Sequence, residues 1–502
     1  MYQMLKQKFL ISLFSEILIY VIGFISLIVI TRLLGPYPIG VISSALAIMS
    51  ILSIFGNLGL GVAHVKLVSE GQDLDSCIST FFLLKVFTSV LMIIIFFLLF
   101  VNNLIPGFKK NTLEGYVILV IFIATFINGF NDIGNFTLTA TLRVTIGKSI
   151  LIFQKLINSL LRIFIGLTKK SVLWLAFVEL LNSLSGFIIY IFVFRNIKLK
   201  WPSKELFRKY ISYGVPSFVI TVNAILLSNV LDKIFLNAFI SAEEVGYYTT
   251  ALSLIIIFTF FSNNLNNILL PIFSDRIKKQ DFNYVNELSK KVEKYIYIFF
   301  SPIIIYAIIY AKEIVLFLFS SKMIRTANIL PPIIIYSFIF LLNRPEVTKI
   351  LGSGKFKFMM WIDLFSLIIS IFLFLIFIPK EIFGIEMMNM GGIGAAISLT
   401  INAFVLHIIY KTYNYFFLVK EKINIKNLLF LVFSFLIFFS LNKFQFLFSK
   451  FDFLIDFVVG FLFYFIISFK LNLISKSELK EFFEFFSLDK IKTTIYGEIR
   501  DL

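Results

Sequence analysis

Fourteen apolar runs of about 20 residues follow one another along the chain, each bounded by charged residues or by Gly, Pro or Asn. A helix of that length spans the hydrocarbon core of a bilayer, where every backbone amide and carbonyl needs a partner within the helix. The runs therefore predict an all-α membrane protein with about 14 transmembrane helices. The predicted spans are Phe9–Ile30, Val41–Val62, Ile78–Val101, Tyr116–Thr137, Ser149–Leu167, Val172–Phe194, Tyr213–Phe235, Tyr247–Ile272, Tyr295–Phe319, Ile329–Leu351, Phe356–Ile378, Gly391–Phe417, Leu428–Phe448 and Phe453–Ile474.

The composition excludes a water-soluble protein of this size. Of the 502 residues, 59% are hydrophobic and 15% are charged, whereas soluble domains are about 45–50% apolar and about 25% charged. Too few polar side chains remain to cover a surface in water. The first run, Phe9–Ile30, is longer than the apolar core of a signal peptide, about 7–15 residues, and is predicted to be retained as a span.

The number of basic residues differs between the two sides of the membrane on which the loops and span ends would lie. The loops and span ends on one side carry 31 of them, and those on the other side carry 10. Because cytoplasmic loops are enriched in Lys and Arg, the richer side is predicted to be cytoplasmic, with both termini there. These loops account for the formal net charge of +17, so no nucleic-acid-binding face is predicted.

Residue types that bind metals or form disulfides are scarce. Cys77 is the single cysteine, and the two histidines, His64 and His407, lie far apart in the sequence. The sequence therefore predicts no internal disulfide, no metal site and no cofactor.

An internal repeat relates the first six spans to the next six. A shift of 206 positions aligns Ile39–Leu46 with Val245–Leu252 and Asn57 with Asn263. Because six is even, both copies start on the same side of the membrane, so their axis lies along the membrane normal. The tail is predicted to be amphipathic because its apolar residues recur at helical spacing among Lys and Glu. The predicted parts are a six-helix lobe in residues 1–200, a second in 205–420, two additional helices in 425–475 and a cytoplasmic amphipathic tail in 476–502.

The first and seventh predicted spans each carry polar side chains on one face. On an α-helix these side chains fall in an arc of roughly 100 degrees in the first span and roughly 60 degrees in the seventh. Two interpretations stay open for the small residues: they pack helix against helix, or they line a hydrated cavity. The two stripes are Ser12, Ser15, Glu16, Gly23 and Ser26 in the first span, and Ser217, Thr221, Ser228 and Asp232 in the seventh.

Ionisable residues within the spans point more strongly to function, because a charge facing lipid costs about 2.5 kcal/mol or more. Lys85 is also compatible with a position near a span end, from which its ammonium would reach the membrane surface. The adjacent Asp232 and Lys233 form the strongest candidate site. The full set is Glu16, Lys85, Arg162, Glu179, Asp232, Lys233, Arg344, Glu346 and Asp363.

Several short motifs carry a family resemblance. They are Thr31-Arg-Leu-Leu-Gly-Pro-Tyr-Pro-Ile-Gly40, Asn57-Leu-Gly-Leu-Gly-Val-Ala-His-Val-Lys66, Tyr213-Gly-Val-Pro-Ser217, Asp232-Lys233 and Glu243-Glu-Val-Gly-Tyr-Tyr248. Through them the chain, over about residues 8–420, resembles the polysaccharide transporter branch of the multidrug/oligosaccharidyl-lipid/polysaccharide exporter superfamily.

The resemblance implies a flippase rather than an enzyme. Such a protein moves an undecaprenyl- or dolichyl-linked oligosaccharide, or a polysaccharide repeat unit, across the cytoplasmic membrane by alternating access between two lobes. The expected partners are this polyprenyl-linked substrate, membrane lipid, a coupling proton or sodium ion, and a polysaccharide polymerase or glycosyltransferases. On this interpretation Arg32, Arg162, Lys233 and Arg344 meet the phosphate charge, Ser15, Thr221 and Ser228 face the sugar, and Glu16 and Asp232 bind the coupling ion.

Other functions stay open. An ion-coupled drug or cation antiporter of the same superfamily would share the repeat, and a lipid II flippase would use the same mechanism with another head group. A membrane glycosyltransferase would also handle lipid-linked sugars, but such enzymes commonly need acidic residues in an outer loop. The predicted first outer loop, Arg32–Gly40, has no acidic residue, and Glu243 and Glu244 in a later loop are interpreted as helix caps.

Overall fold

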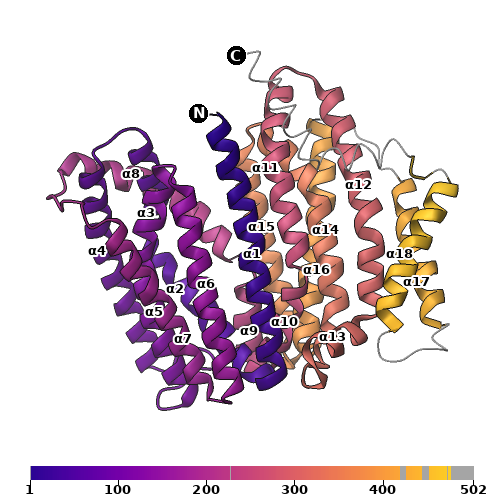
Figure 1. Cartoon of the computed structure of the whole chain (residues 1–502), viewed down its shortest axis with the longest axis horizontal. Coiled ribbons are helices and arrows are strands. Elements are labelled where there is room, and N and C mark those ends of the chain that lie inside the picture. The colour runs from indigo at the N-terminus through magenta and orange to yellow at the C-terminus, as the bar shows by residue number, and fades with distance from the viewer. Residues whose placement is uncertain (1, 227, 419–424, 444–451, 472, 476–502) are drawn as a thin grey trace. The chain divides into compact units, whose positions relative to one another are not determined.

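The computed structural model is almost entirely helical (Figure 1). It describes residues 2–226, 228–418, 425–443, 452–471 and 473–475, so the predicted amphipathic tail, 476–502, lies outside the described residues. The chain folds into two compact units. The first comprises Met1–Ile256, Val315–Ile329 and Met360–Asn402, and the second comprises Ile257–Ile314, Leu330–Met359 and Ala403–Leu502. The lobe boundaries inferred from the repeat stay a prediction.

The described elements follow the order of the predicted spans. The helices are α1 (Tyr2–Leu34), α2 (Pro36–Asn57), α3 (Leu60–Ser69), α4 (Leu74–Val101), α5 (Leu113–Ala140), α6 (Val144–Leu167), α7 (Val172–Val193), α8 (Lys204–Leu226), α9 (Leu231–Phe239), α10 (Ala242–Leu254), α11 (Ile256–Lys278), α12 (Phe282–Ile309), α13 (Ala311–Phe319), α14 (Thr326–Gly352), α15 (Phe356–Phe377), α16 (Gly391–Phe417), α17 (Leu428–Lys443) and α18 (Asp452–Lys470). A small antiparallel hairpin, β1 (Glu381–Ile382) with β2 (Ile385–Glu386), and two 3-10 turns, Ser321–Met323 and Ile425–Asn427, complete them.

Twelve of the described helices are long and apolar enough to cross a membrane, judged by length and composition. They are α1, α2, α4, α5, α6, α7, α11, α12, α14, α15, α16 and α18. The protein is thus a multi-pass all-α membrane protein, as predicted. The two remaining predicted spans, Tyr213–Phe235 and Leu428–Phe448, correspond to the interrupted pair α8 and α9 and to α17, a helix of 16 residues.

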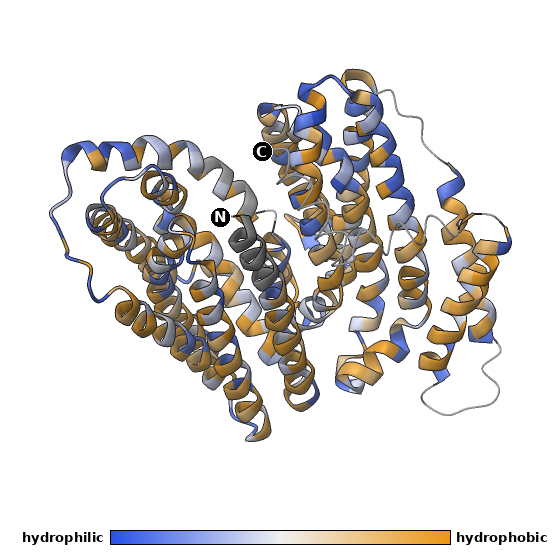
Figure 2. Ribbon diagram, turned by 45° about the horizontal axis from the view of Figure 1, so that its top comes forward, coloured by the Kyte–Doolittle hydropathy of each residue, from blue (hydrophilic) through white to orange (hydrophobic). Residues whose placement is uncertain are grey.

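Several helices extend beyond the predicted spans. The ninth predicted span starts at Tyr295, whereas α12 starts at Phe282. The added turns carry Lys290, Lys291 and Lys294, which end an apolar run without interrupting a helix, because Lys is a good helix former. Figure 2 shows the same pattern elsewhere: apolar residues dominate the middle of the helices, and hydrophilic residues gather at their ends and in the loops.

The Arg-Leu-Leu-Gly-Pro motif forms the turn between α1 and α2. α1 ends at Leu34, Gly35 has a φ of 79°, and Pro36 is the first residue of α2. The positive φ favours glycine, and proline suits a first helical position because its missing N–H would have no partner there. The Gly35 amide donates to the Thr31 carbonyl at 3.0 Å, which closes α1.

Helices α2 and α10 cross at two glycines that the repeat aligns. A Cβ atom on Gly40 would overlap the backbone carbonyl of Ala242, and one on Gly246 would overlap the backbone carbonyl of Pro36. The shift of 206 positions maps Pro36 onto Ala242 and Gly40 onto Gly246, so each contact is the counterpart of the other. Reciprocal contacts of this kind are the property of a two-fold arrangement, and here they relate the starts of α2 and α10.

The first unit has an apolar core among α2, α4, α5 and α7. Its centre includes Ala45, Phe96, Ile121 and Phe122, all buried. The rings of Phe96 and Phe122 stack with their centroids 3.9 Å apart. This packing holds α2, α4 and α5 side by side and so fixes the geometry of the polar side chains between them.

The segment before α8 is fastened to the start of α4. The Lys200 ammonium lies 2.7 Å from the Asp73 carboxylate, and the Lys200 amide donates to the Ser79 hydroxyl at 2.9 Å. The hydrogen bond from Lys200 lowers the pKa of Asp73 to about 2. Asp73 also caps α4, because it accepts from the Ser76 amide at 3.0 Å.

Buried tyrosines anchor the last two described helices in the second unit. Tyr306 of α12 and Tyr310, the residue directly after α12, pack with Phe438 of α17 and Phe453 of α18. The Tyr306 hydroxyl donates to the Phe453 carbonyl at 2.9 Å, and the Tyr310 hydroxyl donates to Asp456 at 2.9 Å. The helices α17 and α18 therefore dock on α12.

Candidate functional site

A row of charged side chains lies among α1, α6 and α7; we call it the seam and define it as Glu16, Lys148, Lys155, Arg162 and Glu179. Lys148, Lys155 and Arg162 recur every 7 residues along α6, which places them on one face of that helix. Lys148 Nζ lies 2.8 Å from the Glu16 carboxylate, and Lys155 interacts electrostatically with Arg162 and Glu179. With three cations and two carboxylates, the seam carries one positive charge in excess.

Arg162 and Glu179 form the ion pair at one end of the seam. Arg162 Nε donates to Glu179 Oε1 at 3.1 Å, and Arg162 Nη2 donates to the same oxygen. Asn158 Nδ2 donates to that oxygen at 3.0 Å. The Arg162 side chain is 25% exposed and that of Glu179 is 15% exposed. The guanidinium therefore remains within reach of an anion while a carboxylate holds its position.

The polar stripe of the first span faces α6. A Cβ atom on Gly23 would lie 2.6 Å from Lys155 Cε, and the Ser26 hydroxyl donates to the Ser159 carbonyl at 3.5 Å. Ser15 is buried. Close helix packing accounts for the small residues, whereas it does not require the charges of the seam.

The seventh predicted span is not one continuous helix. The prediction that Ser228 and Asp232 share a helix face with Ser217 and Thr221 is therefore wrong. α8 ends at Leu226, Asn229 has a φ of 57°, and α9 begins at Leu231. The positive φ breaks the helical path, and the residues on either side of it no longer share a face. Ser228 is exposed and donates to the Ile225 carbonyl at 2.7 Å. Thr221 donates to the carbonyl of Ser217, one turn earlier, at 3.0 Å.

Asp232 is a buried carboxylate with two donors. The Tyr248 hydroxyl donates to Asp232 Oδ2 at 2.6 Å, and the Lys233 amide donates to Oδ1 at 2.8 Å. Asp232 is 1% exposed. The Tyr248 bond joins α9 to α10. The neighbouring Lys233 is half-buried and interacts electrostatically with Asp232.

Arg32 lies at the end of α1 and serves another helix. Its Nε donates to the Leu318 carbonyl at 2.7 Å and its Nη2 donates to the Phe317 carbonyl, both in the last turn of α13. A cation at a helix C-terminus satisfies carbonyls that lack a partner within the helix. In return, Lys322 donates to the Leu33 carbonyl at 2.9 Å. The exposed Arg32 thus caps the C-terminus of α13.

Arg344 belongs to the second unit. Its guanidinium lies 4.2 Å from the centre of the Phe340 ring, and its Nε donates to the Ser262 hydroxyl. Both contacts are of kinds that stabilise a half-buried arginine. The four cations that the sequence assigns to phosphate binding are therefore divided between the first unit and the second.

The second unit also buries a network of ions. The Lys349 ammonium lies 3.1 Å from Glu346, and their side chains are 0% and 1% exposed. The Lys411 ammonium lies 2.8 Å from Glu293 and 3.9 Å from Glu346. Asn414 Nδ2 donates to Glu346 at 2.6 Å. Lys349 and Lys411, which the sequence counts among the cations of loops and span ends, lie in α14 and α16.

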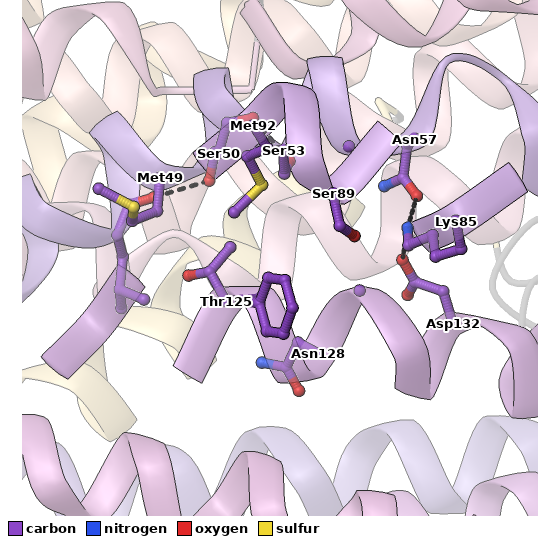
Figure 3. Close-up of a pocket in the computed structure, with 14 residues that line it drawn as sticks. Met49, Ser50, Ser53, Asn57, Lys85, Ser89, Met92, Thr125, Asn128 and Asp132 are labelled. Atoms are coloured by element: carbon purple, nitrogen blue, oxygen red, sulfur yellow. Dashed lines mark hydrogen bonds and ion pairs between the residues drawn. The ribbon is translucent and has the colours of Figure 1, made fainter. Parts of the chain in front are cut away.

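A polar pocket opens between α2, α4 and α5 in the first unit (Figure 3). At one end the Lys85 ammonium donates to the Asn57 side-chain oxygen and lies 3.4 Å from the Asp132 carboxylate. Ser53, Ser89 and other polar side chains continue the lining. Lys85 is 1% exposed, so the alternative that it reaches the membrane surface from a span end is wrong. Its ammonium is instead held inside the helical bundle.

The partners of Lys85 are not among the predicted site residues. Asp132 lies within the predicted span Tyr116–Thr137 and is as ionisable as the candidates named there. Asn57 was noted only for its place in the repeat. A charge in one span and an opposite charge in the next span is a signal that sequence analysis can use, because such charges are stabilised by pairing.

Glu244, which the sequence assigns to an outer loop, is engaged in helix contacts. Glu244 accepts from the Gly392 amide at the start of α16 at 3.0 Å and lies 3.5 Å from Arg325. The Ser241 hydroxyl caps α10 by accepting from the Glu244 amide at 3.2 Å. Over the residues that the structure describes, no group of three or more His, Cys, Asp or Glu side chains is arranged to hold a metal ion.

Comparison with known families decides where the chain belongs. A family model described as polysaccharide biosynthesis protein matches residues 29–328. The chain belongs to this polysaccharide biosynthesis family. The matched region contains Lys85, Asp132, Arg162, Glu179 and the Asp232-Lys233 pair, whereas Glu16 and Arg344 lie outside it.

Solved structures show which fold this polysaccharide biosynthesis family member shares. The lipid II flippase MurJ, in an inward closed conformation, aligns over 93% of this chain and 100% of its own, with 18% identity and a TM-score of 0.73. An inward-facing multidrug resistance MATE family transporter of the MOP superfamily aligns over 78% and 94%, with 15% identity and a TM-score of 0.61. The MATE multidrug transporter DinF-BH aligns over 83% and 97%, with 18% identity and a TM-score of 0.55. At these identities the comparisons establish a common fold, and no curated protein sequence matches the chain.

Proposed function

We propose that this protein is a flippase, which moves a lipid-linked oligosaccharide or polysaccharide repeat unit across the cell membrane by alternating access. The observation that carries the proposal is the seam: charged side chains with a positive excess, held among the spans of a polysaccharide biosynthesis family protein. A purely structural membrane protein has no need of such charges, because each one costs free energy in lipid. The fold shared with the lipid II flippase MurJ supports the same proposal.

The seam has the chemistry that a lipid-linked sugar requires. The cargo combines a polar sugar head, a phosphate or diphosphate and an isoprenoid tail. A guanidinium binds phosphate oxygens through paired N–H groups, and Arg162 is pre-positioned by Glu179. Phosphate can compete with Glu179 for Arg162, with Lys155 and Lys148 supplying further positive charge. Such an exchange keeps the arginine paired throughout, which avoids the large cost of an isolated buried charge.

The remaining predicted roles belong to this proposal. Glu16 and Asp232 are the residues for a coupling proton or sodium ion, and Lys233 and Arg344 are further cations for the phosphate. Both termini are placed in the cytoplasm, following the loop charges. A polymerase or glycosyltransferases of the same pathway are the expected protein partners. The protein itself carries out no bond-making step on this proposal.

The flippase proposal is tested by removing the Arg162–Glu179 pair without leaving either charge alone. The double variant Arg162→Gln/Glu179→Gln is expected to slow flipping about tenfold or more, because a hydrogen bond to a charged group contributes about 1.5–3 kcal/mol. The measurement uses proteoliposomes that contain a labelled polyprenyl-diphosphate oligosaccharide. The fraction of sugar accessible to an added glycosidase is followed with time.

A matched control removes an exposed ion pair instead. Asp275 lies in the last turn of α11 and Lys279 directly follows that helix; their charged groups are 2.8 Å apart, and the side chains are 52% and 63% exposed. Asp275→Asn/Lys279→Gln is expected to leave the flipping rate within about twofold of wild type, since exposed pairs contribute little. Equal flipping by the seam double variant and wild type would remove the seam from the transport path. Absence of flipping by wild type would contradict the proposed function itself.

Asp232 and Lys233 provide a second functional prediction. Asp232→Asn and Lys233→Ala are each expected to reduce flipping at equal abundance in the membrane, because both place an ionisable group among the spans. Tyr248→Phe serves as a structural comparison, since it removes the hydroxyl that donates to Asp232 but keeps both charges. Unchanged transport by Asp232→Asn and Lys233→Ala would exclude both residues from the cavity.

Drug or cation antiport is the second candidate function. It is favoured by one observation, the fold shared with MATE multidrug transporters. The two functions separate in the same vesicles: an antiporter releases protons or sodium ions when a cationic drug is added, and a flippase does not. The polysaccharide biosynthesis family match favours the flippase. Membrane glycosyltransferase activity, a further alternative, would instead lengthen or transfer the labelled oligosaccharide.

A further inference from the structure

The pocket between α2, α4 and α5 lies at the meeting point of three polar helix faces. On each of the three helices, the residues that line the pocket recur at intervals of three or four, the spacing that places side chains on one face of a helix. The volume of the pocket is about 300 Å³, which is at the small end of the range for pockets that hold organic ligands. The lining is Leu46, Ser50, Ser53 and Asn57 from α2, Lys85, Ser89 and Met92 from α4, and Thr125, Asn128 and Asp132 from α5, with Met49, Gly56, Phe126 and Gly129 beside them.

The two charged side chains of this pocket differ in how deeply they are buried. The Lys85 side chain is 2% exposed, and that of Asp132 is 32% exposed. Lys85 lies behind and donates to Asn57 and to Asp132, as the dashed lines in Figure 3 show. The charge that a ligand meets first is therefore the carboxylate. A phosphate would face repulsion from Asp132 at this site.

The hydroxyl groups of the pocket mostly present acceptors. The Ser50 hydroxyl donates to the Leu46 carbonyl at 2.8 Å, and the Ser53 hydroxyl donates to the Ser50 carbonyl at 2.7 Å. The Thr125 hydroxyl donates to the Ile121 carbonyl at 2.8 Å. Because a hydroxyl has a single hydrogen, each of these oxygens has only lone pairs left for a ligand. Together with Asp132, they favour a ligand that donates hydrogen bonds.

Two groups supply donors. Ser89 is 5% exposed and lines the pocket, where its hydroxyl hydrogen is one donor. The Asn128 side-chain oxygen accepts from Asn131 at 3.1 Å, which leaves the Asn128 NH₂ group for a ligand. A hydroxyl hydrogen and an amide NH₂ group can both donate to the oxygen atoms of a ligand. The pocket thus offers several acceptors and a few donors.

This balance matches a sugar better than an ion. A sugar hydroxyl donates one hydrogen bond and accepts others, as the pocket requires. A single dehydrated cation is too small for the volume of about 300 Å³, and Lys85 already neutralises the Asp132 carboxylate. Met49 and Met92 add apolar, adaptable walls beside the polar groups. Such walls suit the C–H faces of a pyranose ring.

Two glycines keep the pocket open. A Cβ atom on Gly129 would lie 3.0 Å from Lys85 Cε, and one on Gly56 would lie 3.2 Å from Met92 Sδ. Either contact is tight for a real side chain, so glycine gives Lys85 and Met92 the room that they occupy.

We propose that the pocket between α2, α4 and α5 binds one uncharged sugar residue of the transported oligosaccharide, with Asp132, Ser89 and Asn128 contacting its hydroxyl groups. This inference rests on the proposed flippase function and adds a subsite to it. The seam receives the phosphate, and the pocket selects the glycan. A sugar subsite separate from the phosphate subsite lets the protein discriminate cargoes that share one lipid carrier.

The test uses a single cysteine placed in the pocket. Cys77 is buried outside it and is replaced by alanine, and Ser53→Cys then provides the only thiol. The purified full-length protein in lipid nanodiscs reacts with the neutral reagent methyl methanethiosulfonate. The probes are free glucose, galactose and N-acetylglucosamine, with inorganic phosphate, sodium chloride and tetramethylammonium chloride for comparison. At least one sugar is expected to slow labelling about tenfold when its concentration is about ten times its Kd.

Two pocket variants and one surface cysteine complete the design. Asp132→Asn is expected to abolish protection by the sugar, and Asn128→Ala, which keeps the Lys85–Asp132 pair, is expected to weaken it about threefold or more. Ser212→Cys, at an exposed position of α8, should react at a rate that sugars do not change. Protection that survives both pocket variants would overturn the inference.

The remaining outcomes separate this inference from the proposed function. If wild type flips its lipid-linked cargo but no sugar protects Ser53→Cys, the sugar subsite is wrong and the flippase stands. If sugars protect but wild type flips nothing, the flippase is wrong. Stronger protection by phosphate or tetramethylammonium than by any sugar would overturn the assignment of ligand. An unreactive Ser53→Cys would show that the pocket is closed to water, which also overturns it.

Discussion

Gly246→Ala is expected to destabilise the protein by about 3 kcal/mol, the upper end of the about 1–3 kcal/mol typical of overpacking. The added methyl group would overlap the backbone carbonyl of Pro36. A backbone carbonyl cannot rotate away as a side chain can, so the two helices have to separate. Gly40→Ala is expected to behave alike, because its methyl group would overlap the Ala242 carbonyl at the counterpart contact. Melting of the purified protein in detergent, followed by size-exclusion chromatography, measures both effects.

Gly147→Ala is the matched control for this prediction. Gly147 also lies in a helix, α6, but a Cβ atom there meets only Leu138 at an ordinary 3.7 Å. Alanine favours the helix by about 0.5–1 kcal/mol over glycine, so this variant should melt at the wild-type temperature or slightly above it. If Gly246→Ala melts at the same temperature as Gly147→Ala, then α2 and α10 do not cross closely.

The crossing also shows what the repeat could predict. Sequence alone aligns Gly40 with Gly246, because the two segments share small and apolar residues at matching positions. The alignment does not show that Gly40 contacts α10 or that Gly246 contacts α2. These contacts depend on how the two copies of the repeat pack, and an alignment of positions gives no distance between them.

The spans were predicted well because length and polarity alone determine them. A run of about 20 apolar residues has few alternatives in lipid. Helix ends were predicted less well, since Lys290 and its neighbours continue α12 beyond the apolar run. The break after Leu226 was missed, because it depends on a positive φ at Asn229 and not on Gly or Pro.

The candidate site was predicted in part. Charge alone marks Arg162 and Glu179 as candidates in the sequence, and the structure pairs them across α6 and α7. Charge also marks Lys85, but its partner Asp132 lies 47 residues further along the chain. Which charges pair depends on which helices are neighbours and on which faces they turn to one another. Local sequence patterns do not contain that information.

Asp132→Asn is the second variant with a large expected effect, because it leaves the Lys85 ammonium buried without its carboxylate. Breaking a wholly buried ion pair costs about 3–5 kcal/mol. Asp132 is 32% exposed, so solvent reduces this cost and a loss of about 2–3 kcal/mol is expected. The double variant Asp132→Asn/Lys85→Met should recover most of the stability, since neither charge remains. Thermal unfolding in one detergent compares the single variant, the double variant and wild type.

The double variant separates the two contributions of the pair. If Asp132 only balances Lys85, a protein with neither charge should melt near wild type and still be protected by sugar. If Asp132 also contacts the sugar, as we infer, the double variant should melt near wild type and lose protection. Asp275→Asn, which breaks an exposed pair with Lys279, should change stability by less than about 1 kcal/mol. A double variant no more stable than Asp132→Asn would show that the buried charge of Lys85 is not the cause of the loss.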